Sequence, residues 1–311
     1  MKIVYTELSS LESDLGVKAH TLYAVSNRLG KHYHPVRIPK ADGSYRQLSV
    51  PDRLLKSIQR KILRVLLSGQ EVSPYATAYR FGGGVVKNAR VHVGKAQILK
   101  LDIRHFFDSI RYSTVKELVF PAGIYSEQNR VLLTMLCYYR DALPQGAPTS
   151  PAISNIILRD FDNTVGAWCA GRGIAYTRYC DDMTFSGEFD AGEVTGLVRR
   201  ELARYGLRLN GAKTKVVDAH HRQTVTGIVV NCKENTAGEY RKKLRQEMYY
   251  CQKYGVRSHL QRTDSADSPE RYLQRLLGRV NFVLSVSPGQ AEMSGYRDWI
   301  RQQLAADGAC D

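Results

Sequence analysis

Two adjacent aspartates, Asp181 and Asp182, interrupt an apolar, strand-like stretch with the sequence RYCDDMTFSG (178–187). Burying two carboxylates side by side is costly unless a cation binds them. A third carboxylate, Asp102, lies near the end of another apolar stretch, AQILKLDI (96–103). If the two stretches are neighbouring strands, the three carboxylates meet. They can then bind two Mg²⁺ ions roughly 3.5–4 Å apart, an arrangement suited to in-line phosphoryl or nucleotidyl transfer.

An aspartate pair in a turn is more often solvated surface, so the metal hypothesis depends on the rest of the chain. The 311 residues include 45 Lys and Arg against 30 Asp and Glu, a formal charge of +15. Such an excess indicates a polyanionic partner, either nucleic acid or an anionic membrane surface. No apolar run of about 18 residues is present, so no membrane span is expected.

The start of the chain, MKIVYTELSSLESDLG, is too polar for a secretory signal. The six cysteines are scattered without a CxxC pair. This pattern favours free thiols in a reducing cytoplasm over a zinc site or a disulfide framework. The length is compatible with about two domain-sized units.

The elements that must position the carboxylates are mixed. Strands are expected within 37–51, around a turn at Asp42-Gly43, and at 96–103 and 224–231. Helices are expected at 9–29, at 52–67 with Asp52 as its cap, at 113–118, at 125–140, from Pro151 onward and at 190–205. A further helix after Glu239 should bury Tyr240, Leu244, Met248 and Cys251. Residues 80–92 are expected to form a glycine-rich loop. Without regular βαβ alternation, the pattern predicts an α+β fold.

Several motifs in a fixed order resemble the reverse transcriptase family, from about residue 20 to 285. RYCDD looks like its YxDD box and LKLDIRHFFDSI like its first aspartate motif. The remaining matches are RIPKADGSYRQLSVPDRLLKSIQRKI in the fingers, LPQGAPTSPAISNIIL between the aspartate motifs, GLRLNGAKTKVV after the catalytic box, and VTGIVVN with YLQRLLGRVNFV toward the thumb.

Within that family the chain resembles bacterial retron reverse transcriptases, because NARVH (88–92) matches their NAxxH signature and 225–227 their VTG triplet. The resemblance implies a right-hand polymerase with fingers, a ferredoxin-like palm of antiparallel sheet and helices, and a small helical thumb. The expected boundaries are 1–95 and 112–145 for the fingers, 96–111 and 146–231 for the palm, and 232–311 for the thumb.

The resemblance also implies roles for individual residues. Asp102, Asp181 and Asp182 would be catalytic and, with the backbone carbonyl of Ile103, would hold two Mg²⁺ ions, or Mn²⁺ in their place. The expected nucleotide-binding residues are Lys40, Arg46, Phe107, Gln145 and Lys213, with Lys215 as an alternative to Lys213. The expected RNA or template-primer contacts are Asn88, His92, Tyr179, Thr226, Gly227, Arg241, Lys242 and Arg245.

The activity implied is RNA-directed DNA synthesis. The enzyme would copy a cognate structured non-coding RNA into single-stranded multicopy DNA, primed from a guanosine 2′-hydroxyl of that RNA. Its partners would be this RNA, the RNA–DNA hybrid product, deoxynucleoside triphosphates and a separate effector protein in anti-phage defence. The alternatives are a group II intron-like or other stand-alone reverse transcriptase, and a non-catalytic RNA-binding scaffold. The role of the glycine-rich loop at 82–84 stays open.

Overall fold

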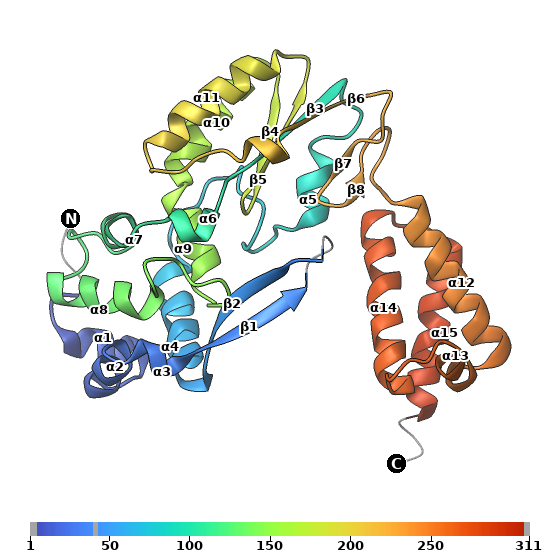
Figure 1. The fold of residues 1–311 in the computed structure, drawn as a ribbon, viewed down its shortest axis with the longest axis horizontal. Coiled ribbons are helices and arrows are strands. Elements are labelled where there is room, and N and C mark those ends of the chain that lie inside the picture. The colour runs from blue at the N-terminus through green and yellow to red at the C-terminus, as the bar shows by residue number, and fades with distance from the viewer. Residues whose placement is uncertain (1–4, 40–42, 308–311) are drawn as a thin grey trace. The chain divides into compact units, whose positions relative to one another are not determined.

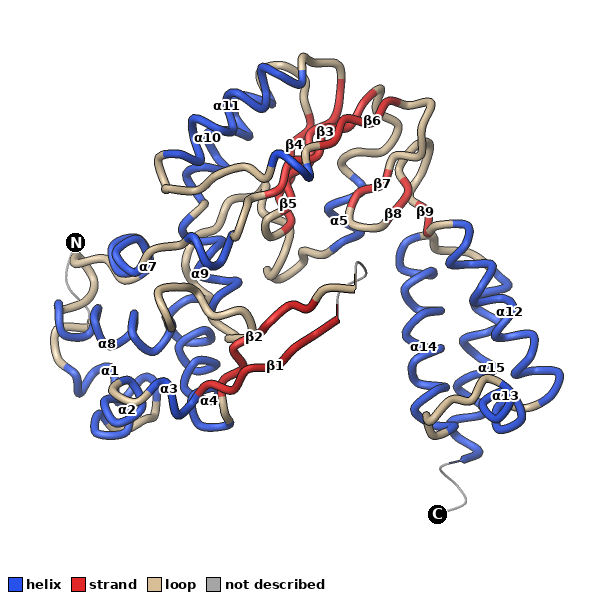
Figure 2. Tube along the Cα trace, viewed as in Figure 1, coloured by secondary structure: helices blue, strands red, loops and turns tan. Residues whose placement is uncertain are grey.

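The structure is a computed structural model that describes residues 5–39 and 43–307. The chain divides into two compact units (Figures 1 and 2). The first contains Met1–Gly84 and Gln97–Val216, and the second contains Val85–Ala96 and Val217–Asp311. A short segment before the first aspartate motif therefore belongs with the C-terminal part of the chain.

A four-stranded sheet with the order β4-β5-β3-β6 carries the carboxylates. Its strands are β3 (Gln97–Asp102), β4 (Ala175–Tyr179), β5 (Asp182–Gly187) and β6 (Lys215–Asp218). β5 lies antiparallel between β3 and β4, and Asp102 faces Asp182 in the register. The prediction that the two aspartate stretches are neighbouring strands is confirmed.

Helices pack against this sheet within the first unit, where α10 lies against β4 and α11 against α10 (Figure 1). Pro151 stands in the first turn of α9, as predicted. The helical segments of this region are α6 (Phe106–Ser109), α7 (Tyr112–Val119), α9 (Ser150–Ile157), α10 (Arg159–Ala170), α11 (Ala191–Ala203) and the 3₁₀ turn η2 (Gly211–Lys213).

The N-terminal part of the first unit combines helices with a hairpin. Its elements are α1 (Leu8–Leu15), α2 (Ala19–Ser26), α3 (Leu29–His32), β1 (Tyr33–Pro39), β2 (Tyr45–Pro51), α4 (Arg53–Ile62), the π-helical turn η1 (Leu63–Leu67) and α8 (Glu127–Cys137). The predicted hairpin is confirmed, although part of its turn lies outside the described residues. The Asp52 side chain accepts a hydrogen bond from the Leu55 backbone N–H at 2.8 Å, which confirms the predicted cap.

The prediction of one helix over 9–29 is wrong. Gly16 adopts a left-handed conformation with φ of 56° and ends α1, since such a residue cannot continue a right-handed helix. A second helix then starts at Ala19. The apolar spacing across the break is close enough to helical periodicity to hide it.

The second unit joins a small sheet to a helical bundle. Its elements are α5 (Val85–Arg90), β7 (Thr224–Val225), β8 (Ile228–Val229), β9 (Asn235–Thr236), α12 (Gly238–Tyr254), α13 (Val256–Arg262), α14 (Pro269–Val286) and α15 (Ala291–Asp307). α5 packs on β7 and β8, and α14 packs against α12, α13 and α15. Leu244, Met248 and Cys251 are buried as predicted, and Tyr240 is half-buried beside them.

Two further expectations about this unit are corrected. The expected strand at 224–231 is a hairpin, because Thr226 and Gly227 take positive φ values of 45° and 81° and reverse the chain. The expected loop at 80–92 contains the helix α5, which carries the start of the NARVH motif. In the described ranges no helix is both long and apolar enough to cross a membrane. The five described cysteines are free thiols, as predicted.

Candidate active site

A tight turn between β4 and β5 presents Asp181 beside the end of β3. Tyr179 pairs with Asp182 as the last residue pair of the hairpin, so Cys180 and Asp181 form the turn. Cys180 has φ of 61°, a left-handed conformation that non-glycine residues adopt at a cost. The Ile103 backbone N–H donates to the Asp181 carbonyl at 3.1 Å and fixes the turn against the first aspartate strand.

The carboxylates are held close against their mutual repulsion. Asp102 and Asp182 lie directly opposite on antiparallel strands, a placement that is destabilising for like charges. Burial, followed by the negative charges of Asp181 and Asp102, raises the pKa of Asp182 to about 6. The site therefore favours any cation that can neutralise the three groups.

Asp102 already has two partners in the structure. The Lys213 Nζ lies 2.8 Å from one carboxylate oxygen, and the Asn210 side-chain amide donates to the other at 3.0 Å. The hydrogen bond to Asp102 raises the pKa of Lys213 above its ordinary value. The sequence left Lys213 and Lys215 as alternatives, and the structure brings Lys213 to the carboxylates. Asn210 was not singled out beforehand, although it stands in the motif GLRLNGAK.

The donor set fits a divalent cation, since carboxylate oxygens are the ligands that Mg²⁺ prefers. Among the residues that the structure describes, no three acidic, histidine or cysteine side chains are already arranged to hold an ion. Asp102 is instead paired with Lys213, so ion binding has to compete with this lysine. The predicted use of the Ile103 carbonyl as a ligand stays a prediction.

A cavity of about 810 Å³ opens in front of the carboxylates. It brings together residues from β2, the loop before α9, the turn and the 3₁₀ segment. The predicted residues that line it are Asp102, Ile103, Asp181, Asp182, Arg46, Phe107, Gln145, Tyr179 and Lys213. Lys40 lies outside the described residues.

Two of the lining residues are fixed by backbone contacts. The Phe107 carbonyl accepts from the Leu143 N–H, and its half-buried ring packs on Phe106 with ring centroids 5.2 Å apart. The Gln145 carbonyl accepts from the Ser49 N–H at 2.9 Å. The next residue, Gly146, has φ of 124°, and a Cβ there would lie 2.9 Å from the Ser49 carbonyl oxygen. Only glycine allows β2 to approach this closely.

A buried ion pair below the turn was missed by the sequence analysis. Arg178 and Asp162 are both fully buried, and their side chains make hydrogen bonds of 2.6–3.1 Å. Tyr176 donates its hydroxyl to the same carboxylate, and Arg178 donates its Nη1 to the Cys180 carbonyl. The pair thus supports the turn that carries Asp181. An arginine within the apolar strand AYTRYC was the available signal, since such a residue needs an acidic partner.

The retron signature residues lie inside the second unit. Asn88 and His92 are buried, and burial followed by the charge of Lys95 lowers the pKa of His92 to about 3. The Asn88 amide lies 3.5 Å from the Thr226 hydroxyl, which donates to the Val85 carbonyl at 3.0 Å. These contacts join α5 to the β7-β8 hairpin. RNA contact by Asn88 and His92 stays a prediction. In the structure both side chains are buried, whereas Gly227 is exposed.

The predicted cations of α12 differ in their surroundings. Arg241 donates to the Asn235 side chain and the Thr236 carbonyl, and Arg245 forms an ion pair with Glu292 at 2.9 Å. Lys242 is exposed and has no ion pair with any described residue. Of the three, Lys242 is the cation most available to a phosphate backbone.

The carboxylate-bearing antiparallel sheet and its cavity define an α+β polymerase. The family model described as reverse transcriptase (RNA-dependent DNA polymerase) matches residues 38–234, and the chain belongs to this family. It is 32% identical over 307 residues to the retron Mx65 reverse transcriptase of Myxococcus xanthus, which covers 91% of this chain and 68% of that protein.

Two Escherichia coli proteins are also similar to the chain. The retron Ec83 reverse transcriptase is 30% identical over 290 residues, 86% of this chain and 87% of that protein. The retron Ec86 reverse transcriptase is 29% identical over 243 residues, 78% of this chain and 72% of that protein. The chain is a retron-type reverse transcriptase, an RNA-directed DNA polymerase, and the predicted family and fold class are confirmed. Reverse transcriptases generally use divalent metal ions.

Proposed function

We propose that this polymerase copies one structured non-coding RNA into single-stranded multicopy DNA, primed from a guanosine 2′-hydroxyl of the same RNA. The observation that carries the proposal is the extent of the similarity to the Mx65 enzyme, which covers 91% of the chain and so continues beyond the family match at 38–234. The family match ends at residue 234, whereas this likeness includes part of the chain beyond it. The proposal includes cytoplasmic localisation and an anti-phage role with a separate effector protein.

The three aspartates would hold two Mg²⁺ ions, which supply charge neutralisation and activate the attacking oxygen. Arg46 would bind phosphate oxygens of the incoming deoxynucleotide, because its guanidinium can form paired hydrogen bonds with them. Gln145, in the loop before α9, would contact the same nucleotide. Lys213, with its raised pKa, holds a proton at Nζ and would neutralise the departing pyrophosphate.

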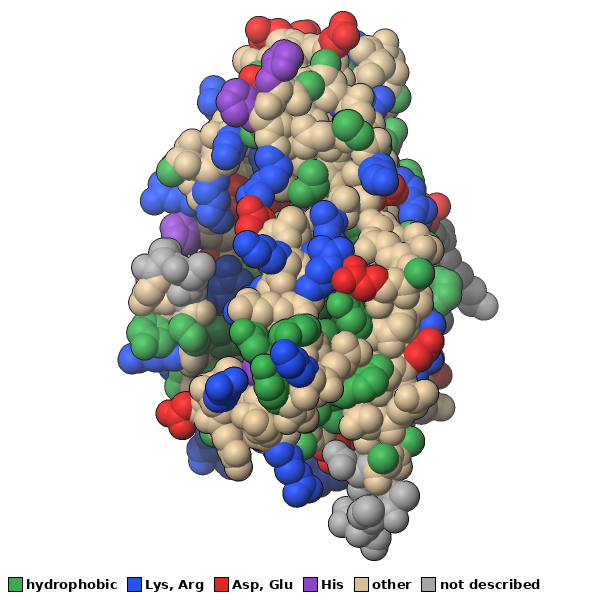
Figure 3. All heavy atoms as spheres, turned by 90° about the vertical axis from the view of Figure 1, so that its right-hand side faces the viewer, with side chains coloured by type: hydrophobic (Ala, Val, Ile, Leu, Met, Phe, Trp, Pro, Cys, Tyr) green, Lys and Arg blue, Asp and Glu red, His purple; other side chains and the backbone are tan. Residues whose placement is uncertain are grey.

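The excess positive charge supports a nucleic-acid partner. Figure 3 shows exposed Lys and Arg side chains, with acidic side chains interspersed among them. Nucleic acid binds such surfaces mainly by counterion release, a term that falls steeply with salt. Fingers, palm and thumb with the boundaries given above stay part of the proposal.

Replacing Phe107 with alanine or valine is expected to raise the use of ribonucleotides relative to deoxynucleotides by about tenfold or more. The ring lines the catalytic cavity, and a smaller side chain leaves room for a 2′-hydroxyl. The measurement is the ratio of kcat/KM values for matched ribo- and deoxynucleotides on a primed RNA template. Phe107→Tyr keeps the bulk and should keep the ratio. An unchanged ratio in the alanine variant would show that Phe107 only packs in the core.

The protein is expected to prefer the RNA encoded beside its gene over an unrelated hairpin of equal length by at least about tenfold at raised salt. Non-specific phosphate binding weakens there, whereas contacts to RNA shape and unpaired bases persist. Competition binding measures the preference. Exchanging residues 240–311 for those of another retron enzyme should abolish it, whereas extension of a pre-annealed primer on a generic template should be affected less.

The two readouts separate recognition from catalysis. Parallel loss of both activities in the exchanged protein would show that these helices support the polymerase itself. Absence of any preference in the natural protein would overturn the retron assignment of substrate and favour a reverse transcriptase without a dedicated RNA.

A further inference from the structure

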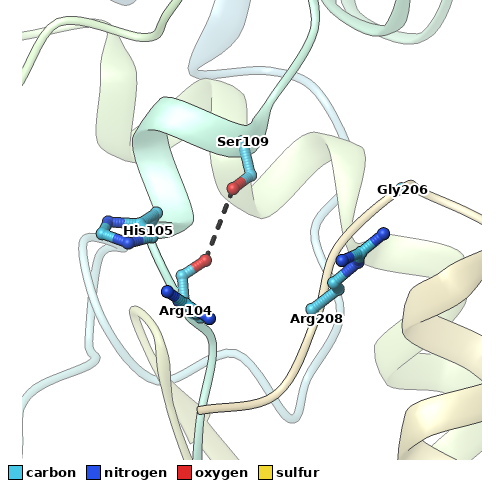
Figure 4. Close-up of a pocket in the computed structure, with 5 residues that line it drawn as sticks. All are labelled: Arg104, His105, Ser109, Gly206 and Arg208. Atoms are coloured by element: carbon cyan, nitrogen blue, oxygen red, sulfur yellow. Dashed lines mark hydrogen bonds between the residues drawn. The ribbon is translucent and has the colours of Figure 1, made fainter.

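A second cavity, of about 420 Å³, lies beside the catalytic one. Arg104, His105, Ser109, Gly206 and Arg208 line it (Figure 4). Arg104 and His105 also line the catalytic cavity, so the two spaces share a wall. His105 has φ of 48°, a left-handed conformation that takes the chain out of the aspartate strand at this wall.

The walls of this second cavity, called here the basic pocket, carry like charges close together. The Arg104 N–H donates to the Arg208 carbonyl at 2.9 Å, and Ile103 forms an antiparallel bridge with Leu209. Arg104 and Arg208 are therefore opposite one another on neighbouring segments, which is unfavourable for two cations. Figure 4 shows them on the two sides of the pocket.

A third arginine, Arg111, immediately precedes α7 and lies near the same place. A Cβ on Gly206 would lie 3.6 Å from the Arg111 Cζ, so this guanidinium covers the glycine that lines the pocket. Gly206 itself has φ of 71° and turns the chain there. Two arginines therefore line the pocket, and the guanidinium group of Arg111 lies beside its lining residue Gly206.

These three arginines have no ion pair with any described residue, in contrast to other arginines of the same unit. Arg204, four residues before Arg208, pairs with Glu201 at 2.9 Å, and Arg130 pairs with two glutamates. Clustered guanidinium groups without acidic partners leave the surface short of negative charge. A bound anion supplies it, and guanidinium groups suit phosphate oxygens best.

We propose that the basic pocket binds inorganic pyrophosphate, the product of each addition step, on its way out of the catalytic cavity. In that step the oxygen of the primer hydroxyl bonds to the α-phosphorus and its proton passes to solvent, while the α–β phosphoanhydride bond breaks and its electron pair leaves with pyrophosphate. Because Arg104 and His105 line both cavities, the basic pocket lies next to the cavity in which pyrophosphate is formed. The proposal rests on the polymerase activity and not on the identity of the template RNA.

The test measures product inhibition by added inorganic pyrophosphate during primer extension on a generic RNA template. Arg208→Gln, which lies outside the catalytic cavity, should raise the inhibition constant for pyrophosphate about fivefold or more. Arg208→Gln combined with Arg111→Gln should raise it further. The KM for deoxynucleotides and the affinity for primer-template should stay within about twofold. Arg208→Lys keeps the charge and should recover most of the effect, and Arg204→Gln is the matched control.

Three outcomes would overturn the proposal. An unchanged inhibition constant with weaker primer-template binding would assign the pocket to backbone phosphate. A deoxynucleotide KM that rises in step with the inhibition constant would assign it to the incoming triphosphate. Equal inhibition constants in all variants, with no other change, would leave the arginines without a ligand role.

Direct titration of inorganic pyrophosphate into the protein without nucleic acid gives an independent reading. It should show binding that weakens in Arg208→Gln and not in Arg204→Gln. If the natural protein extends no primer yet binds pyrophosphate in this way, the polymerase assignment is wrong and the assignment of the pocket as a pyrophosphate site is retained. If the natural protein extends primers but its titration shows no binding, the pyrophosphate site is refuted and the polymerase assignment is retained.

Discussion

Replacing Asp181 with asparagine is expected to lower DNA synthesis by about a thousandfold or more while the protein stays folded and binds RNA. The asparagine keeps the shape of the turn but removes one of the charges that would hold divalent cations. The backbone contact from the Ile103 N–H to the Asp181 carbonyl does not depend on the side chain, so the hairpin should persist.

Primer extension with Mg²⁺ on a generic RNA template measures the effect. Asp160→Asn, which changes a surface aspartate paired with Arg159, is the matched control and should leave the rate within about twofold. In the natural enzyme the rate at limiting Mg²⁺ should also rise with pH up to about 6, the pKa of Asp182 without a bound ion, because protons compete with the cation for this carboxyl below that value. Full activity of Asp181→Asn would exclude the three aspartates as the catalytic centre.

Removing the buried carboxylate of Asp162 is expected to lower the free energy of unfolding by about 3–5 kcal/mol. Asp162→Ala leaves the Arg178 guanidinium fully buried without its ion-pair partner, and the Tyr176 hydroxyl loses its acceptor. Urea unfolding of the purified protein measures the change. Asp160→Ala, two residues away on the same helix but exposed, should change stability by less than about 0.5 kcal/mol.

The double variant Asp162→Leu with Arg178→Met separates the loss of a partner from the loss of the pair. Replacing a buried ion pair by apolar side chains is often neutral for stability, so the double variant should recover much of the loss. Its DNA synthesis should stay reduced, because Arg178 no longer donates to the Cys180 carbonyl behind the catalytic turn. A single Asp162→Ala variant as stable as the natural protein would show that the pair contributes little.

The parts of the fold that could be predicted from the sequence depend on local signals. The apolar stretches around Asp102 and Asp182 identify two strands, and the hypothesis that these strands are neighbours is confirmed by the register. Asp52 after Pro51 marks a helix start, and its hydrogen bond to Leu55 confirms it. The residues around the catalytic cavity followed from motifs whose order matches a known family.

The features that were missed depend on contacts between distant segments or on single backbone angles. Nothing near Arg178 in sequence indicates that Asp162, on another element, will neutralise it. Asn88 and His92 were expected to contact RNA, yet both side chains are buried, and α5, which carries Asn88, packs on the β7-β8 hairpin. The left-handed conformation of Gly16 divides a helix whose apolar spacing is otherwise continuous.

The most direct test of the central claim is to sequence the nucleic acid that co-purifies with the protein. The protein is expressed in cells together with the DNA that neighbours its gene. The account predicts one abundant single-stranded DNA, complementary to part of a structured RNA encoded beside the gene and joined to a guanosine of that RNA through a 2′-linkage. The Asp181→Asn protein should yield the RNA without the DNA. Recovery of no DNA from the natural protein, or of mixed DNA copied from many unrelated RNAs, would contradict it.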